Sequence, residues 1–248
     1  MLKKLYDKNE LVFALTWIAA YCVLMSAGDA LSAAIGIEKS VTLAVGILLS
    51  AILLSFLKKN GLFEAYGFRR AEASAGAMLY YLPVIIMLTA NLWYGLTLNY
   101  GAAETVLYVL SMFCVGFLEE VVFRGLLFEA MRKDNLTSAV IVSSVTFGIG
   151  HIINLVNGSG AELLPNLLQV VYATAAGFMF VMMYIKTKSL IGCIVTHGVF
   201  NALSVFADEA SASREMRILS CILLASITSC YAVYLALTMK KGGKDSNE

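Results

Sequence analysis

Residues 117–131 read F-L-E-E-V-V-F-R-G-L-L-F-E-A-M, an apolar run that contains Glu119, Glu120 and Arg124. An isolated ionised side chain at the centre of a bilayer costs about 2.5–3.5 kcal/mol, so such a cluster indicates a functional site. Glu120 and Arg124 are four residues apart, and on a helix they share a face and can form an ion pair. Glu119 points about 100° away and faces a different neighbour. The alternative interpretation is a purely structural ion-pair cluster between helices.

The composition of the whole chain indicates a polytopic membrane protein. Of its 248 residues, 60% are hydrophobic and 14% are charged, whereas an ordinary soluble domain has about 25% charged residues. The net charge is +1, and no feature of the sequence suggests nucleic-acid binding. The five cysteines lie within apolar runs and form no C-x-x-C pair, so neither a disulfide framework nor a thiolate metal site is expected.

Eight apolar runs have about the length needed to cross a hydrocarbon core of about 30 Å. They cover residues 11–27, 41–57, 75–98, 106–131, 136–156, 163–185, 190–207 and 218–239. The expected fold is an all-α, polytopic integral membrane bundle of about eight transmembrane helices. We expect residues 1–239 to form a single domain and residues 240–248 to form a short, polar, disordered cytoplasmic tail.

The basic residues predict the orientation of the bundle, because cytoplasmic segments of membrane proteins carry an excess of Lys and Arg. With a cytoplasmic N-terminus, the outside loops hold only Lys39, Arg214 and Arg217, and Arg124 lies within a span. The other fourteen fall on inside segments: Lys3, Lys4, Lys8, Lys58, Lys59, Arg69, Arg70, Arg132, Lys133, Lys186, Lys188, Lys240, Lys241 and Lys244. We therefore expect a multi-pass cell-membrane protein with both termini in the cytoplasm.

The chain has two histidines, and both lie within predicted spans. At a rise of about 1.5 Å per residue, Glu119 is expected about 19 Å from the cytoplasmic surface and His151 about 22 Å. His197 and Asn201 are expected at about 10–17 Å. Independent structural groups have no reason to share a depth. We therefore infer one polar cavity among the fourth, fifth and seventh spans, and we expect it to open toward the cytoplasmic half of the bilayer.

The residue types in this cavity favour hydrolysis by an activated water. The sequence contains no G-x-S-x-G motif, no H-E-x-x-H motif and no aspartate pair within a span. Glu119 can take a proton from a water that is held together with His151. His197 and Asn201, one helical turn apart, can donate hydrogen bonds to the oxyanion of a tetrahedral intermediate. These four groups suffice for amide hydrolysis.

Three motifs on separate spans resemble those of the CPBP family of intramembrane proteases. They are E-E-x-x-x-R at Glu119–Arg124, F-x-x-x-H at Phe147–His151 and H-x-x-x-N at His197–Asn201. The family includes type II CAAX prenyl endopeptidases and bacterial bacteriocin self-immunity (Abi) proteins. The resemblance implies that Glu119 and His151 activate water and that His197 and Asn201 form the oxyanion site. It also implies that Glu120, Arg124 and Phe147 support these groups.

The resemblance implies an intramembrane endopeptidase that acts on a hydrophobic or membrane-associated protein or peptide, in peptide maturation or bacteriocin self-immunity. The family has also been called metalloprotease, and Glu119, His151 and His197 are the residues that would hold a zinc ion. We favour a mechanism without a metal, because the sequence places no carboxylate partner for a zinc-bound histidine. The alternative from another class is a non-catalytic membrane protein that binds a peptide, confers immunity or acts as a scaffold.

Overall fold

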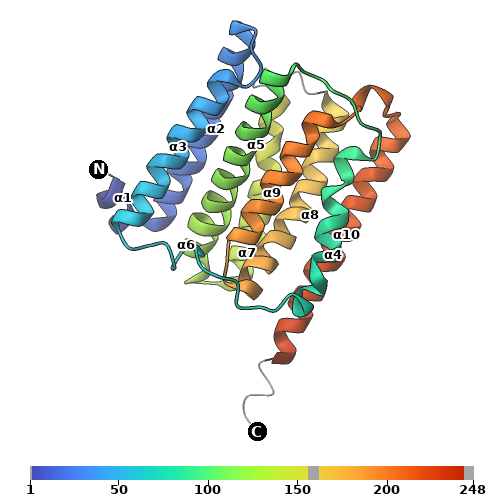
Figure 1. Ribbon diagram of the computed structural model, residues 1–248. Helices are drawn as coiled ribbons and strands as arrows, with labels where there is room; N and C mark the ends of the chain where they lie inside the picture. Colours follow the sequence, from blue (N-terminus) through green and yellow to red (C-terminus); the bar gives the residue numbers. More distant parts are fainter. Residues whose placement is uncertain (1, 156–161, 243–248) are drawn as a thin grey trace.

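The protein is a bundle of helices that run in alternating directions between two ends (Figure 1). The computed structural model describes residues 2–155 and 162–242, with the side chains of 2–155 and 162–239. The α-helices are α1 (Leu2–Lys8), α2 (Glu10–Ile35), α3 (Ser40–Lys59), α4 (Leu82–Leu88), α5 (Ala102–Glu120), α6 (Glu129–Arg132), α7 (Leu136–Gly150), α8 (Leu163–Thr187), α9 (Ile191–Leu203) and α10 (Arg214–Gly242). In the described ranges the only β-type pairing is an isolated bridge between Leu96 and Ala207.

Six helical segments are long and apolar enough to cross a membrane: Glu10–Ile35, Ser40–Lys59, Ala102–Arg132, Leu136–Leu155, Leu163–Thr187 and Arg214–Met239. Two shorter apolar segments, Gly76–Leu92 and Ile191–Phe206, occupy the positions of the third and seventh predicted spans. The all-α polytopic bundle is therefore confirmed. The two short segments differ from the expectation of eight full-length spans.

The third predicted span is broken rather than continuous. A 3₁₀ segment, Gly76–Tyr81, precedes α4, and the backbone at Leu79, Tyr80 and Tyr81 has positive φ values of 50°, 51° and 57°. The helix starts again with Pro83 in its first turn, where the missing N–H of proline costs no hydrogen bond. An apolar run does not reveal such a break, because its hydrophobicity is the same with and without it.

Two predicted boundaries fall at the limits of the described residues. The fifth predicted span ends at residue 156, which lies outside them. The predicted tail begins at residue 240, whereas α10 continues as a helix to Gly242. Residues 243–248 lie outside the described residues.

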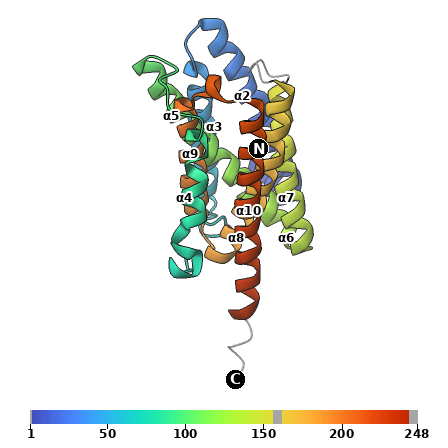
Figure 2. The same ribbon diagram turned by 90° about the vertical axis from the view of Figure 1, so that its right-hand side faces the viewer.

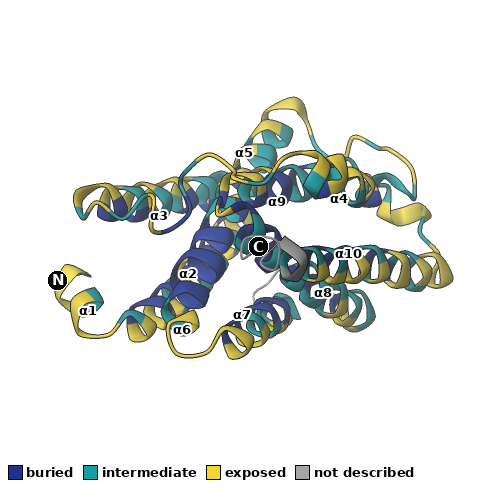
Figure 3. Ribbon diagram, turned by 90° about the horizontal axis from the view of Figure 1, so that it is seen from below, coloured by how far each residue is buried: buried dark blue, intermediate teal, exposed yellow. Residues whose placement is uncertain are grey.

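The helices form two layers, with α3, α5, α9 and α4 in one layer and α2, α7, α8 and α10 in the other (Figures 2 and 3). Large apolar side chains remain exposed on the outer faces of α2, α3 and α10, for example Val23, Leu48 and Val233, which are 65%, 59% and 57% exposed. Continuous apolar surfaces of this kind mark contact with another apolar phase. Together with the length of the helices, they identify a membrane protein.

Glycine residues let α5 approach α9 closely. A Cβ atom added to Gly116 would lie 2.6 Å from the backbone nitrogen of Gly198 on α9. Small residues allow this kind of close backbone contact between helices in membranes. The contact brings the end of α5, with Glu119 and Glu120, beside His197 of α9.

Gly116→Ala is therefore expected to destabilise the fold by about 1–3 kcal/mol, the usual cost of overpacking. The measurement is the thermal unfolding midpoint of the purified protein in detergent. Gly192→Ala is the matched control, because within the described chain no atom lies within 4 Å of the Cβ that it adds on α9. Equal midpoints for the two variants would show that the close contact of α5 with α9 is not needed.

Candidate active site

Glu120 forms a buried ion-pair cluster that links α5 to α9. Its Oε1 atom accepts hydrogen bonds from Nη1 of Arg124 at 3.0 Å and from Nδ1 of His197 at 2.8 Å. The side chains of Glu120 and Arg124 are fully buried. The predicted pairing of Glu120 with Arg124 is confirmed, and the structure adds His197 as a third member of the cluster.

Arg124 lies in a π-helical segment, Val121–Phe128, which joins α5 to α6. A regular α-helix was expected here from the sequence. All eight residues of the segment are buried, and the guanidinium of Arg124 lies 4.1 Å from the centroid of the Phe147 ring. π-Helical turns are rare and occur frequently at functional sites, because the wider turn redirects side chains.

Glu119 faces the space between the two layers. Its Oε1 atom accepts a hydrogen bond of 2.6 Å from the hydroxyl of Tyr21 on α2. Its Oε2 atom lies 3.3 Å from Nε2 of His197 and accepts no hydrogen bond from the described part of the chain. A buried carboxylate oxygen without a donor is costly. This oxygen is therefore suited to accept a hydrogen bond from a water or a substrate.

His151 follows the last residue of α7 and is held by backbone contacts. Its Nδ1 atom lies 3.0 Å from the carbonyl oxygen of Phe147, and the side-chain amide of Asn166 on α8 donates a hydrogen bond of 2.8 Å to the backbone carbonyl oxygen of His151. A carbonyl oxygen can only accept, so we assign the proton to Nδ1. Nε2 of the neutral ring is then an acceptor and can hold a water molecule.

His197 has the same arrangement, because its Nδ1 atom also faces an acceptor, the carboxylate of Glu120. With a proton on Nδ1, the Nε2 atom donates a hydrogen bond only when the ring carries both protons. In that state the charges of Glu119, Glu120, Arg124 and His197 sum to zero. The oxyanion-binding role expected for His197 thus requires the imidazolium form.

Phe147 packs between the two histidines. Its ring lies edge-on to His151 at a centroid distance of 5.1 Å and to His197 at 5.6 Å. Its face meets the guanidinium of Arg124. Phe147 therefore fixes the spacing of His151, His197 and Arg124, which gives the F-x-x-x-H motif a physical basis.

The predicted catalytic residues line adjacent spaces between the layers. The largest, which we call the polar cavity, has a volume of about 420 Å³ and is lined by Glu119, His151 and Asn201 among others. A pocket of about 100 Å³ shares Glu119 and His151. A third pocket, of about 40 Å³, is lined by His151, His197 and Asn201. His151 lines all three spaces, so the structure brings the four residues together around it.

The polar cavity lies toward the end of the bundle away from the basic connections 60–75 and 133–135, whereas the sequence predicted an opening toward the basic end. Asp29, Glu209 and Arg217 line it near the chain turns that the sequence analysis assigned to the outside. The helix directions explain the difference. Because α7 begins at Leu136, beside the connection 133–135, His151 lies at the far end of this helix from that connection.

The rim of the cavity carries an ion pair between Asp29 and Lys39, with an Nζ–Oδ1 distance of 2.8 Å. Burial acts to lower the pKa of Lys39, but the charge of Asp29 and its hydrogen bond outweigh that effect and raise the pKa above its usual value. Lys39 therefore keeps its positive charge at neutral pH.

Sequence reasoning missed Tyr21, the closest polar contact of Glu119. A single tyrosine in the first apolar run looks like a packing residue, and it belongs to none of the three motifs. Nothing in the sequence connects it to a residue 98 positions away. The amides Asn166 and Gln169 of α8, which also line the polar cavity, were missed for the same reason.

The zinc alternative was tested against the arrangement of the side chains. Within the described residues, no three His, Cys, Asp or Glu side chains are grouped so that they could hold a metal ion. Nδ1 of His197 faces Glu120 and Nδ1 of His151 faces a carbonyl oxygen, contacts that also orient metal-bound histidines, so Glu120 is the carboxylate partner that the sequence did not place. The residues present do not form a three-ligand site, so we derive no step through a metal.

The fold and the site define a polytopic helical membrane protein with a buried Glu–His–Asn cluster between two layers. Residues 101–203, which contain all three motifs, match the family described as "Type II CAAX prenyl endopeptidase Rce1-like". This match confirms, for that segment, the resemblance to the CPBP family.

A curated protein of Bacillus subtilis (strain 168), named "Putative membrane peptidase YdiL", is 34% identical over 104 residues. The alignment covers 42% of this chain and 37% of the length of that relative. No solved structure matches the chain at a significant level.

Proposed function

We propose that the protein is an intramembrane endopeptidase that hydrolyses a peptide bond with a water activated by Glu119 and His151. The observation that carries the proposal is the buried Oε2 atom of Glu119, which lies 3.3 Å from Nε2 of His197 and borders the same cavity as His151 and Asn201. The similarity of residues 101–203 to prenyl endopeptidases and to a membrane peptidase supports it.

The proposed reaction uses four side chains. Nε2 of His151 and Oε2 of Glu119 hold the water, and Glu119 takes one of its protons while the water oxygen bonds to the carbonyl carbon. Asn201 and doubly protonated His197 donate hydrogen bonds to the resulting oxyanion. The C–N bond then breaks, and the leaving nitrogen takes the proton from Glu119. The products are a new carboxyl group and a new amine.

We also propose that residues 1–239 work as a single domain, although the family match covers only residues 101–203. Tyr21 of α2, which lies outside the matched segment, holds Glu119. The substrate class that fits is a hydrophobic or membrane-associated protein or peptide. Peptide maturation and bacteriocin self-immunity are the biological roles that we propose for such an activity.

Tyr21→Phe is expected to lower kcat by about 10- to 100-fold with little change in KM. A hydrogen bond to a charged group contributes about 1.5–3 kcal/mol, and here it orients the proposed base rather than the substrate. Tyr184→Phe is the matched control, since Tyr184 donates a hydrogen bond of the same length, 2.6 Å, to buried Glu129 away from the cavity. A rise in KM alone, or equal losses in both variants, would contradict the positioning role of Tyr21.

Hydrolysis itself is tested with the purified protein in liposomes, incubated with a peptide library in ¹⁸O-labelled water. Mass spectrometry is expected to find cleaved peptides whose new carboxyl group carries one ¹⁸O atom. Parallel samples with and without a chelator report any need for a metal. Peptides that bind but stay intact would replace the proposal with the non-catalytic peptide-binding protein.

A further inference from the structure

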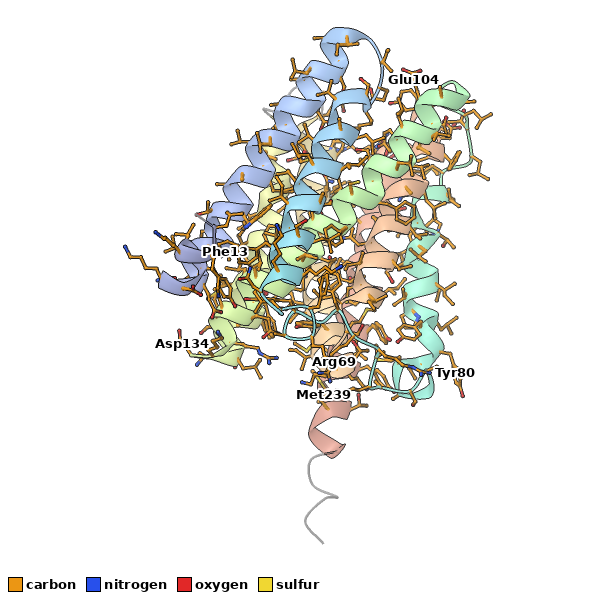
Figure 4. All side chains as sticks on the ribbon, turned by 60° about the vertical axis from the view of Figure 1, so that its left-hand side comes forward. Phe13, Arg69, Tyr80, Glu104, Asp134 and Met239 are labelled. Atoms are coloured by element: carbon orange, nitrogen blue, oxygen red, sulfur yellow. The ribbon has the colours of Figure 1, made fainter. Side chains whose placement is uncertain are left out.

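The two ends of the bundle differ in charge. Figure 4 shows Arg69, Asp134 and Met239 at one end and Glu104 at the other. The first end, which we call the basic face, comprises the connections 60–75, 133–135 and 188–190 and the adjoining helix ends. Among the residues whose side chains are described, it carries eleven basic ones: Lys3, Lys4, Lys8, Lys58, Lys59, Arg69, Arg70, Arg132, Lys133, Lys186 and Lys188.

The N-terminal segment belongs to this face, because Lys133 pairs with Glu10 at the start of α2 at 2.6 Å. The opposite face comprises the connections 36–39, 93–101 and 204–213. Among the described residues of this face, the only basic side chains are Lys39, Arg214 and Arg217. Basic segments stay in the cytoplasm, so both termini are assigned to the cytoplasm and the opposite face to the outside.

The polar cavity reaches the opposite face and not the basic face. Its rim includes Asp29 near the end of α2, Asn154 after α7, Glu209 before α10 and Arg217 in the first turn of α10. Among the described residues, none from the three basic-face connections lines it. At its inner end the cavity reaches Glu119.

We propose that the polar cavity admits a peptide from the outer side of the membrane, so that the substrate is an exported or extracytoplasmic segment. The cleavage of that segment rests on the proposed function, whereas the accessibility of the cavity does not. A volume of about 420 Å³ falls within the range of about 300–1,000 Å³ that is usual for ligand sites.

The charge of the opposite face favours a basic substrate segment. Seven carboxylates lie on this face against three basic side chains: Asp29, Glu38, Glu104, Glu162, Asp208, Glu209 and Glu215. Two of the basic side chains are already neutralised, Lys39 by Asp29 and Arg217 by Glu209. The remaining negative charge attracts cations to the mouth of the cavity.

Thiol labelling tests the direction of access without a known substrate. Ser220→Cys places a thiol on the wall of the polar cavity, and Asp134→Cys is the matched control on the basic face, where Asp134 is exposed. Intact cells and inverted membrane vesicles are treated with a membrane-impermeant maleimide. Mass spectrometry then assigns the label to each cysteine, which separates the new thiols from the five native ones.

The expected result is that position 220 is labelled in intact cells and position 134 only in inverted vesicles. Labelling of position 220 only in inverted vesicles, from both sides, or from neither side would overturn the proposal. Because the readout needs no cleavage, its failure is distinct from a failure of the peptidase assignment. If the protein cleaves peptides but fails the labelling test, the proposed function stands and only the proposed direction of access is rejected.

Discussion

Replacement of Glu119 by glutamine is expected to lower the rate of peptide cleavage by about 10²- to 10⁴-fold, the usual contribution of a general base. Glutamine has nearly the shape of glutamate, and its side-chain carbonyl can still accept the hydrogen bond from Tyr21. What it loses is the ability to take a proton from water. The measurement is kcat/KM of the purified protein in liposomes, with a peptide found in the ¹⁸O screen.

The matched control is Glu129→Gln, because Glu129 is also buried and also accepts a hydrogen bond of 2.6 Å from a tyrosine. It lines none of the three cavities that contain the site residues. The control should therefore retain its activity when it is compared at equal amounts of protein. Loss of activity in both variants would mean that buried carboxylates act through stability and not through chemistry.

Arg124→Ala is expected to destabilise the protein by about 3–5 kcal/mol, the cost of removing one partner from a buried ion pair. The guanidinium is fully buried, pairs with Glu120 and packs on the ring of Phe147. Its removal leaves the carboxylate of Glu120 buried with only His197 as a partner. The measurement is the abundance of the protein in membranes, together with its unfolding midpoint in detergent.

Arg132→Ala provides the comparison on the same helical segment. Arg132 pairs with Glu129 at 2.8 Å, but its side chain is 39% exposed, and exposed pairs contribute only about 0–1 kcal/mol. Glu129 also keeps its hydrogen bond from Tyr184. Normal abundance of the Arg124→Ala variant would count against a structural role of the buried pair.

The sequence predicted the all-α membrane bundle and the Glu120–Arg124 pair because both depend on local properties. An apolar run near twenty residues has few alternatives to a membrane helix. Two residues four apart meet on one helix regardless of the rest of the fold. The sequence also predicted that four polar residues lie together, because they were expected at similar depths: Glu119, His151, His197 and Asn201. The depth of a residue is also a local quantity once the direction of each span is known.

The remaining features depend on contacts between distant segments, and the sequence could not supply them. Tyr21 meets Glu119 only because α2 packs against the end of α5. His197 binds Glu120 as well as facing Glu119, since the glycine contact between α5 and α9 sets their separation. The π-helical turn and the break before α4 change the backbone without changing the apolar pattern.

The direction in which the cavity opens relative to the cytoplasm stays a prediction, because it depends on the orientation of the bundle in the membrane. His151 was expected about 22 Å from the cytoplasmic surface, in a hydrocarbon core of about 30 Å. That depth already lies beyond the midplane. In the structure the cavity is lined by Asp29, Glu209 and Arg217, at the end of the bundle away from the connections 60–75 and 133–135.

The most direct test of the peptidase assignment compares membranes from cells that carry the wild-type protein or the Glu119→Gln variant at matched expression. Mass spectrometry of peptides and protein C-termini is expected to find cleavage products in the wild type that are missing from the variant, and these products identify the substrate. An identical set of peptides and C-termini in both samples, with any immunity phenotype retained by the variant, would contradict a catalytic role for Glu119.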